Sequence, residues 1–257
     1  MSHAETFTDG VLRAATLLQE AHHAVALTGA GHSTSSGIPD FRSPDTGLWE
    51  RADPMEVASL YAFRCNPEAF YEWIRPLALA LLVAEPNPGH RALAKLEADG
   101  WLKAVITQNI DGLHQRAGSH EVLELHGHLR KMTCINCYRV VSVGELVEQF
   151  IRSGEVPRCD VCGGVMKPNV VLFGEQLPIE VVNAAMAHVH RADLMLVAGS
   201  SLEVMPASHL PLVVHEHAGR LIVVNLTPTY VDDVADVVIH GDVAEVLPRI
   251  ARACEGG

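Results

Sequence analysis

AVALTGAG, residues 24–31, is a short apolar run that ends in a glycine-rich turn. The same order recurs at residues 104–107, 194–198 and 221–224, where an apolar run again precedes a polar loop. A helical apolar pattern at residues 88–100 separates the first two of these runs. Near-continuous apolar runs are typical of parallel strands whose two faces are both covered by helices. The sequence therefore predicts an α/β fold with a doubly wound, parallel, Rossmann-like sheet.

Two segments interrupt this alternation. Residues 39–83 contain a cluster of aromatic side chains, and residues 127–167 contain four cysteines. We expect both to be insertions that together form a smaller lobe, helical in the first segment and a zinc ribbon in the second. The Rossmann-like domain would then consist of residues 1–38, 84–126 and 168–257. Ligands of such sheets bind beyond the carboxyl ends of the strands, so we expect the functional residues to converge there.

The four cysteines stand in two C-x-x-C pairs, Cys134 with Cys137 and Cys159 with Cys162. The 21 residues between the pairs are close to the spacing of zinc ribbons. A site of four thiolates has no open position, so we expect a structural Zn²⁺ and seek catalysis elsewhere. Two disulfides and a redox C-x-x-C are the alternatives, and both are disfavoured because the chain shows no secretory signal pattern.

Composition narrows the class of protein. The chain has 257 residues, of which 48% are hydrophobic and 19% charged, and a formal net charge of −12. Such an acidic chain is not expected to bind the phosphates of nucleic acids, although residues 127–167 are locally basic. No run approaches the roughly 20 apolar residues of a membrane span. We expect a monomeric, cytoplasmic protein with no nucleic-acid or membrane partner.

The first glycine loop is by itself a weak dinucleotide signal. Gly29 and Gly31 would let the main chain approach a pyrophosphate, but Thr34 replaces the third glycine of the G-x-G-x-x-G pattern. An ordinary strand-to-loop turn is the alternative. A Rossmann oxidoreductase is disfavoured for the same reason, because that fingerprint and its following acidic residue are both missing.

The motifs that continue from this loop are far more specific. They are GIPDFRS at residues 37–43, TQNIDGLH at 107–114, LHG at 125–127, the two cysteine pairs, KPNVVLFGE at 167–175, GSSLEVMP at 199–206, VN at 224–225 and GD at 241–242. In this order, and over nearly the whole chain, they resemble the sirtuin family.

The resemblance implies an NAD-dependent protein-lysine deacylase that acts on acyl-lysine proteins or peptides. NAD⁺ would be consumed as a co-substrate, giving nicotinamide, free lysine and 2′-O-acyl-ADP-ribose. One structural Zn²⁺ would be bound per chain. Two alternatives stay open: an NAD-dependent protein mono-ADP-ribosyltransferase, and a non-catalytic NAD-sensing zinc-ribbon module.

The resemblance also assigns the NAD contacts. The phosphate and ribose cradle falls on Gly29, Ala30, Gly31, Gly199, Ser200 and Ser201, the adenosine ribose on Asn225, and adenine on the loop that ends at Val243. The nicotinamide half falls on Gln108, Asn109, Ile110 and Asp111, with Phe41 as a cover for the reactive ribose and Asp40 and Arg42 ordering the loop. Turn formation is the alternative role of the glycines and of the Asn-Ile-Asp-Gly segment.

His126 is the residue that the resemblance identifies as the catalytic base. An imidazole with a pKa near its usual 6.5 suits the deprotonation of a ribose hydroxyl at neutral pH. The chain has 15 histidines, and His114 and His128 are the nearest competitors. The acylated peptide is expected to lie extended between two segments as an added strand, against Val171, Phe173, Gly174, Glu175 and Val204.

Two departures from the family pattern bear on specificity. Ile74 and Leu77 stand where members that remove succinyl or malonyl groups carry Tyr and Arg. An anionic acyl chain would therefore find no guanidinium partner, so we expect acetyl or longer aliphatic acyl groups. His32 stands where the family usually has a small or aliphatic residue.

Overall fold

The structure is a computed structural model that describes residues 7–40 and 53–256. Its main sheet has six strands in the order β3-β2-β1-β7-β8-β9, all paired in parallel. The strands are β1 (Ala24–Thr28), β2 (Ala104–Thr107), β3 (Val122–Glu124), β7 (Leu194–Ala198), β8 (Arg220–Asn225) and β9 (Val237–His240). This is the Rossmann order, in which the chain reverses direction across the sheet between β1 and β7. The predicted fold class is confirmed.

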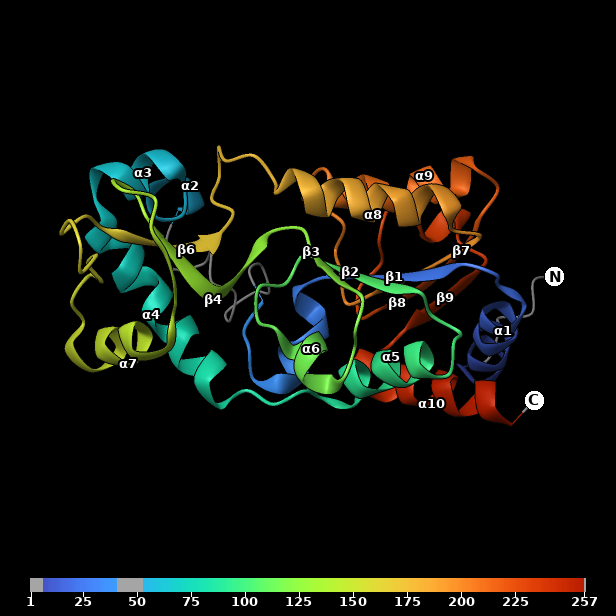
Figure 1. Cartoon of the computed structure of the whole chain (residues 1–257). Coiled ribbons are helices and arrows are strands. Elements are labelled where there is room, and N and C mark those ends of the chain that lie inside the picture. The colour runs from blue at the N-terminus through green and yellow to red at the C-terminus, as the bar shows by residue number, and fades with distance from the viewer. Residues whose placement is uncertain (1–6, 41–52, 257) are drawn as a thin grey trace.

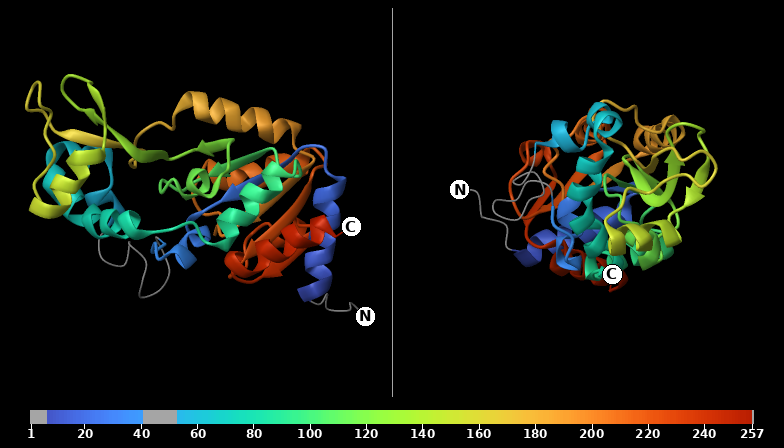
Figure 2. Two further views of the ribbon diagram at one scale, coloured as in Figure 1. Left: turned by 60° about the horizontal axis from the view of Figure 1, so that its bottom comes forward. Right: turned by 90° about the vertical axis from the view of Figure 1, so that its left-hand side faces the viewer.

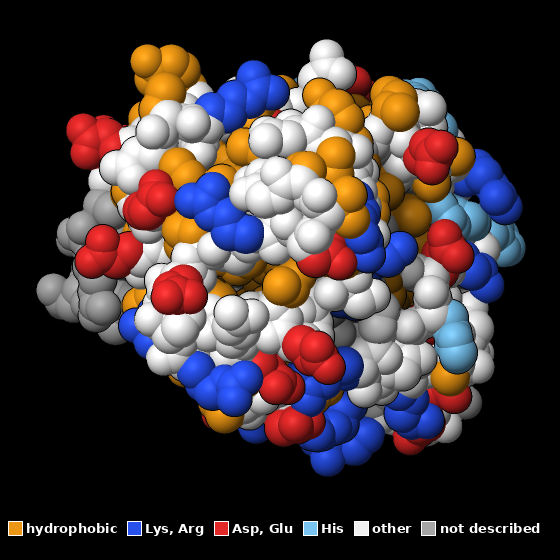
Figure 3. All heavy atoms as spheres, turned by 60° about the vertical axis from the view of Figure 1, so that its left-hand side comes forward, with side chains coloured by type: hydrophobic (Ala, Val, Ile, Leu, Met, Phe, Trp, Pro, Cys, Tyr) orange, Lys and Arg blue, Asp and Glu red, His pale blue; other side chains and the backbone are white. Residues whose placement is uncertain are grey.

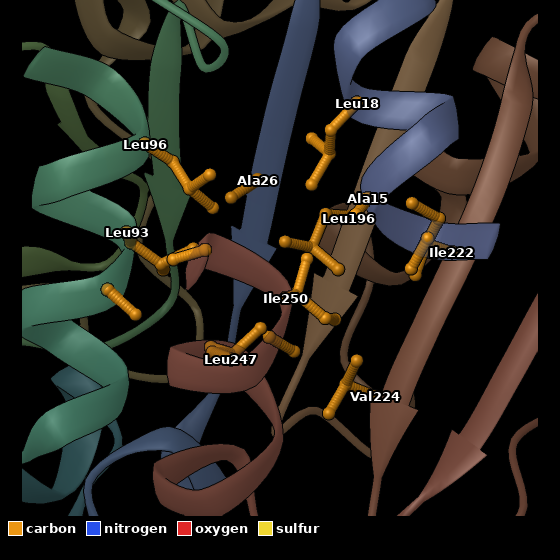
Figure 4. Packing of buried hydrophobic residues seen from close by; sticks show 14 of the residues in the cluster. Ala15, Leu18, Ala26, Leu93, Leu96, Leu196, Ile222, Val224, Leu247 and Ile250 are labelled. Carbon is orange, nitrogen blue, oxygen red and sulfur yellow. The ribbon is translucent and has the colours of Figure 1, made fainter. Parts of the chain in front are cut away.

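Helices cover both faces of this sheet (Figure 1). Along β1, Ala24 and Ala26 belong to one apolar cluster, whereas Val25 and Leu27 belong to the other. The first cluster is shown in Figure 4, where helices carry Leu18, Leu93 and Leu247 onto the sheet. Its helices are α1 (Phe7–Glu20), α5 (Pro88–Ala98) and α10 (Val243–Glu255), and the opposite face is covered by α8 (Ile179–Arg191) and α9 (Leu210–Glu216).

Local sequence sets where α5 begins. The Asn87 side chain accepts hydrogen bonds from the backbone N–H groups of Gly89 and His90, and Pro88 occupies the first turn. The His90 ring accepts a hydrogen bond from the Asn87 backbone N–H in return. This reciprocal cap satisfies N–H groups that the first turn of a helix leaves free, and it holds the His90 side chain inward.

A second sheet and its helices lie at one end of the molecule (Figure 2). The sheet is antiparallel, with the order β5-β4-β6. Its strands are β4 (Gly127–Cys134), β5 (Val140–Ser142) and β6 (Met166–Val170), and the helices beside it are α2 (Pro54–Val57), α3 (Leu60–Cys65), α4 (Pro67–Val83) and α7 (Gly144–Ser153). We call residues 53–83 and 127–170 the small lobe. Strand β6 extends three residues past the sequence-based boundary at 167.

The small lobe has its own core, built largely from aromatic side chains. Phe63, Phe70, Tyr71 and Phe150 are buried together, and the Tyr71 hydroxyl donates a hydrogen bond to the Met166 carbonyl. Because helix α4 and strand β6 are joined in this way, the two inserted segments form one packed unit.

On the face in Figure 3, Lys and Arg side chains alternate with Asp and Glu side chains. Arg139 pairs with Asp160 at 3.2 Å, and Arg158 with Glu68 at 3.9 Å. The basic residues around the cysteines are thus partly neutralised by acidic neighbours. Within the described ranges, no helix is both long and apolar enough to cross a membrane.

Candidate active site at the strand ends

The loops that follow β1 and β7 touch each other through their backbones. A Cβ atom on Gly31 would lie 3.0 Å from the Gly199 carbonyl oxygen, and one on Gly29 would lie 2.8 Å from the Ser200 Cβ. Gly199 has φ +64°, and a Cβ there would lie 2.3 Å from the His32 nitrogen. Only glycine fits such a contact, so these glycines allow the two loops to form one cradle at the strand ends.

Polar side chains that follow β2 reach into the same cradle. The Gln108 amide donates to the Ser200 hydroxyl at 3.0 Å. The Asn109 amide donates to the Gly29 carbonyl at 2.9 Å and to the Ser33 hydroxyl at 3.1 Å. The structure therefore brings together predicted NAD-contact residues from three separate parts of the sequence.

Ser33 and His90 belong to this network, although the sequence analysis did not select them. The Ser33 hydroxyl donates to the Asp111 carboxylate at 2.7 Å and lies 3.4 Å from the His90 Nε2. Burial raises the pKa of Asp111, while hydrogen bonds from the Leu113 N–H and from Ser33 oppose that shift. The position of Ser33, two residues after Gly31 in the glycine-loop motif, was the available sequence signal.

His126 is held by hydrogen bonds on both sides. The His126 Nδ1 lies 3.1 Å from the Gln108 carbonyl oxygen. The His126 backbone carbonyl accepts a hydrogen bond from the Val171 N–H at 2.9 Å. A carbonyl can only accept, so Nδ1 carries the proton and Nε2 keeps its lone pair. Burial lowers the pKa of His126, and the Gln108 hydrogen bond partly opposes this shift. Gly127 allows the turn, because a Cβ there would lie 2.1 Å from the Asn169 carbonyl oxygen.

The segment assigned to adenosine lies at the ends of β8 and β9. Asn225 is buried and donates to the Thr227 carbonyl at 2.8 Å. Val243 begins α10 and its side chain is part of the sheet core, which leaves its backbone for any ligand contact. Ser35 in the glycine loop donates to the Asp242 carboxylate at 2.8 Å, so this end is tied to the cradle.

The segment assigned to the peptide leads away from His126 along the small lobe. Phe173 forms backbone hydrogen bonds of 2.9 Å with Ala58 and with Leu60, and its side chain is 40% exposed. The Glu175 carboxylate accepts a hydrogen bond from the Leu172 N–H and pairs with Lys167 at 2.9 Å. That carboxylate is therefore engaged within its own loop.

The remaining predicted residues fall in different places. Gly174 has φ +85°, Val171 and Val204 are half-buried, and Ser201 is exposed. Ile110 packs against the core of the small lobe, and Asp40 is half-buried. Phe41 and Arg42 lie outside the described residues.

The four predicted cysteines converge at the tip of β4. Their sulfur atoms all lie within 4.8 Å of one another, with Cys134 and Cys162 at 3.5 Å and Cys137 and Cys159 at 3.7 Å. A tetrahedral zinc with Zn–S bonds of about 2.3 Å separates its sulfurs by roughly 3.8 Å, whereas a disulfide needs about 2.05 Å. The donor set and spacing therefore fit a zinc ion and do not fit disulfides.

The surroundings of the cysteines support the same fit. Hydrogen bonds from the backbone N–H groups of Cys137 and Asn136 lower the pKa of Cys134 to about 6. A Cβ atom on Gly164 would lie 2.9 Å from the Cys134 sulfur, so a larger residue would displace that ligand. Backbone N–H groups aimed at sulfur stabilise the thiolate that binds metal.

Comparisons with known proteins agree with this geometry. The model of the Sir2 family matches residues 29–206. An NAD-dependent protein deacylase 2 from Archaeoglobus fulgidus is 49% identical over 245 residues, which span 95% of this chain and 96% of that protein. An NAD-dependent protein deacetylase from Caldivirga maquilingensis is 46% identical, with 96% and 95% of the two chains covered. The chain therefore belongs to the Sir2 family, as the resemblance to sirtuins predicted.

Solved structures of the family superpose closely on this one. A Sir2 complex with a p53 peptide and NAD⁺ has a TM-score of 0.85 and 44% identity, and covers 94% of this chain and 96% of that one. A structure of Sir2Af2 bound to a myristoylated histone peptide has a TM-score of 0.83 and 43% identity, with 96% and 97% covered.

Proposed function

We propose that this chain is an NAD-dependent protein-lysine deacylase, which transfers the acyl group of a modified lysine to ADP-ribose and releases nicotinamide. The observation that carries the proposal is the state of His126. It stands at the junction between the sheet and the small lobe, and its Nδ1 is committed to the Gln108 carbonyl. A neutral imidazole with a free Nε2 lone pair is the form that a general base requires.

The nicotinamide half of NAD⁺ would bind among Gln108, Asn109 and Asp111. The carboxamide of nicotinamide offers one acceptor and two donors, and Asp111 together with backbone groups can match them. Ser33 and Asn109 fix the Asp111 network before any ligand arrives. Such preorganised hydrogen bonds orient the ligand without a further ordering cost. His90, through Ser33, would be a positioning residue.

The pyrophosphate would lie on the cradle formed by the loops after β1 and β7. Glycines at 29, 31 and 199 bring backbone N–H groups to the strand ends, where parallel sheets bind ligands. A solved Sir2 complex with a p53 peptide and NAD⁺ supports the binding of NAD⁺ by this fold. Asn225 and the backbone at Val243 would serve the adenosine end.

We further propose that one Zn²⁺ binds Cys134, Cys137, Cys159 and Cys162 and has a structural role. Four thiolates complete a tetrahedral shell, so the ion would hold the tip of the small lobe and take no part in the reaction. We also propose the division expected from the sequence, into a Rossmann-like domain and an inserted small lobe. Monomeric state, cytoplasmic location and the absence of a nucleic-acid partner stay predictions from the sequence.

An acyl-lysine peptide would add an extended strand beside residues 171–175 and 202–204. Backbone pairing provides affinity with little preference for side chains. Ile74 and Leu77 are 5% and 3% exposed and belong to the small-lobe core, so they offer no charged partner to an acyl chain. The structure of Sir2Af2 bound to a myristoylated histone peptide supports long aliphatic substrates. We expect acetyl or aliphatic groups to react faster than succinyl groups.

The test is to incubate the chain with NAD⁺ and a panel of acyl-lysine peptides and to measure nicotinamide and peptide mass together. Equal release of nicotinamide and deacylated peptide supports the proposal. His126→Ala is expected to bind NAD⁺ and to lower turnover by about 10²–10⁴-fold, which is the usual contribution of a general base. His128→Ala is the matched control and is expected to stay within a few-fold of the parent.

Three outcomes would contradict the proposal. ADP-ribose found on protein without loss of acyl groups would indicate a mono-ADP-ribosyltransferase. NAD⁺ binding without nicotinamide release would indicate a non-catalytic NAD sensor. Full turnover in His126→Ala would remove this residue from the reaction.

A further inference from the structure

Three histidines from separate parts of the chain meet beneath the glycine loop. His32 lies in that loop, His90 in the first turn of α5, and His114 in α6 (Leu113–Ala117). All three are at most 1% exposed, and their ring centroids lie 4.5 to 5.0 Å apart. We call these residues the buried histidine cluster. The proposed deacylation assigns no step to the cluster as such.

The cluster contains buried nitrogens without hydrogen-bond partners. Among the described residues the His114 Nδ1 has no hydrogen-bond partner, and neither ring nitrogen of His32 forms a well-aligned hydrogen bond, although the Ala198 backbone interacts with that ring. Burying a polar atom without a partner is unfavourable, and native proteins rarely leave three such atoms side by side. The departure from the family pattern at His32 thus places a buried imidazole next to the unsatisfied nitrogen of His114.

The orphaned nitrogen of His114 is a lone-pair donor. Thr28 donates its single hydroxyl proton to Thr107 at 2.8 Å, so the His114 Nε2, 2.9 Å from the Thr28 oxygen, must carry a proton and donate it. Its Nδ1 is then unprotonated. The three rings are in contact and away from water, where charged imidazoles would repel one another, so neutral imidazoles fit this cluster.

We propose that His32, His90 and His114 form a second metal site, which takes one divalent late first-row transition ion such as Zn²⁺ or Co²⁺. One nitrogen from each ring lies within 4.8 Å of the other two. Imidazole nitrogens around a tetrahedral zinc, with bonds of about 2.0–2.1 Å, stand roughly 3.4 Å apart, so a small inward rotation of the rings closes the site. Neutral imidazole is the ligand that these ions prefer.

Neighbouring groups already orient two of the ligands. Thr28 holds the His114 ring through Nε2, as an outer partner does for a metal-bound histidine. The Asn87 side chain donates to the His32 carbonyl at 2.8 Å and fixes its backbone. The His90 Nδ1 accepts a weak 3.3 Å hydrogen bond from the Asn87 N–H, and metal binding through Nε2 would give up this bond and the contact with the Ser33 hydroxyl.

The experiment is a Co²⁺ titration of the full chain without a histidine tag, refolded from denaturant with the ion present so that burial does not block entry. The parent is expected to bind two Co²⁺ per chain. One gives the strong near-ultraviolet charge-transfer band of thiolate ligands, and the other adds only visible ligand-field bands. His32→Leu is expected to lose the second ion and keep the first. His23→Leu, which changes a buried histidine outside the cluster, is expected to keep both.

Two further measurements keep the test decisive. His114→Gln can preserve the hydrogen bond to Thr28 while losing the Nδ1 ligand, and it is also expected to bind one ion. Zn²⁺ added beyond the amount that saturates the cysteine site is expected to raise the unfolding temperature of the parent but not that of His32→Leu. A single Co²⁺ in the parent, or two in both His32→Leu and His114→Gln, would overturn the proposal and leave buried water as the partner of these nitrogens.

Discussion

The six-stranded sheet and the small lobe are stabilised in different ways. Every residue of β1, β2 and β7 is buried, and apolar clusters lie on both faces of the sheet. In the small lobe, all three residues of β5 are exposed or half-buried, and the cluster around the cysteines has only four buried members. The sheet can therefore fold on apolar burial, whereas the tip of the small lobe has little apolar burial of its own, and there we propose that zinc supplies the stability.

This difference explains where the chemistry lies. The sheet is stabilised by apolar burial on both faces, so the loops at its strand ends can carry the glycines and polar side chains of the candidate site. In the small lobe, the proposed role of the four cysteines is structural. His126 lies between β3 of the six-stranded sheet and β4 of the small lobe, and its hydrogen-bond partners are Gln108 and Val171.

The largest expected effect is the loss of the cysteine site. Cys137→Ser removes one ligand of a site whose metal contributes roughly 10–16 kcal/mol in small zinc domains. We expect amides of β4, β5 and β6 to lose protection in hydrogen exchange while those of β1, β7 and β8 keep it. Cys65→Ser, at an exposed cysteine outside the cluster, is the control. Equal loss of protection in both regions would show that the sheet depends on the cysteine site as much as the small lobe does.

A second test changes the junction itself. Gly127 has φ +76° and Gly100 has φ +84°, but only at Gly127 would a Cβ meet backbone, 2.1 Å from the Asn169 carbonyl. We expect Gly127→Ala to cost more than about 3 kcal/mol and to abolish deacylation, and Gly100→Ala to cost about 1 kcal/mol from strain alone. Denaturant unfolding of the two variants measures the difference. Similar costs would mean that the crowding at Gly127 is relieved easily.

A third test addresses the sheet core. Leu93 is fully buried between α5 and the sheet, whereas Leu79 in α4 is 46% exposed. Leu93→Ala is expected to lower the free energy of unfolding by about 2–5 kcal/mol and Leu79→Ala by less than about 1 kcal/mol. Protection of the small-lobe amides should stay unchanged in Leu93→Ala, while that of the sheet amides falls. A loss of protection in the small lobe of Leu93→Ala would show that the stability of the small lobe depends on the sheet core.

The smallest expected effect is a shift in pH dependence. Burial lowers the pKa of His126 in the folded chain, and the base acts when it is unprotonated. Activity should therefore be full at neutral pH and fall only as pH drops below the usual histidine value of about 6.5. The acid limb of kcat/KM for an acyl-lysine peptide measures this pKa. An acid limb with a pKa above 6.5 would mean that the site stabilises the protonated imidazole.

Much of the fold could be predicted from the sequence, because it depends on local apolar patterns. The runs at residues 24–28, 104–107 and 194–198 became β1, β2 and β7 with the same bounds. The edge strand β3 was not predicted, because it has only three residues and its identity depends on pairing with β2. The pairing of β4 with β6 joins segments far apart in the chain, which periodicity does not report.

The candidate site was predictable only where motifs marked it. Gln108, Asn109 and Asp111 were selected from one motif and converge with the glycine loop. Ser33 and His90 were not selected, because their role depends on a contact across 57 residues of chain. The selected Glu175 side chain is engaged with Lys167, a pairing that the motif alone does not reveal.

The sequence by itself determined the alternating strands and helices, the spacing of the four cysteines and the family to which the chain belongs. Each of these features depends on residues that are close together in the sequence, through apolar periodicity or a fixed interval between residues. Only the tertiary structure decided which histidine is oriented as a base and which three are buried together. Proton positions, unmatched nitrogens and burial depend on neighbours that the folded chain brings from distant segments.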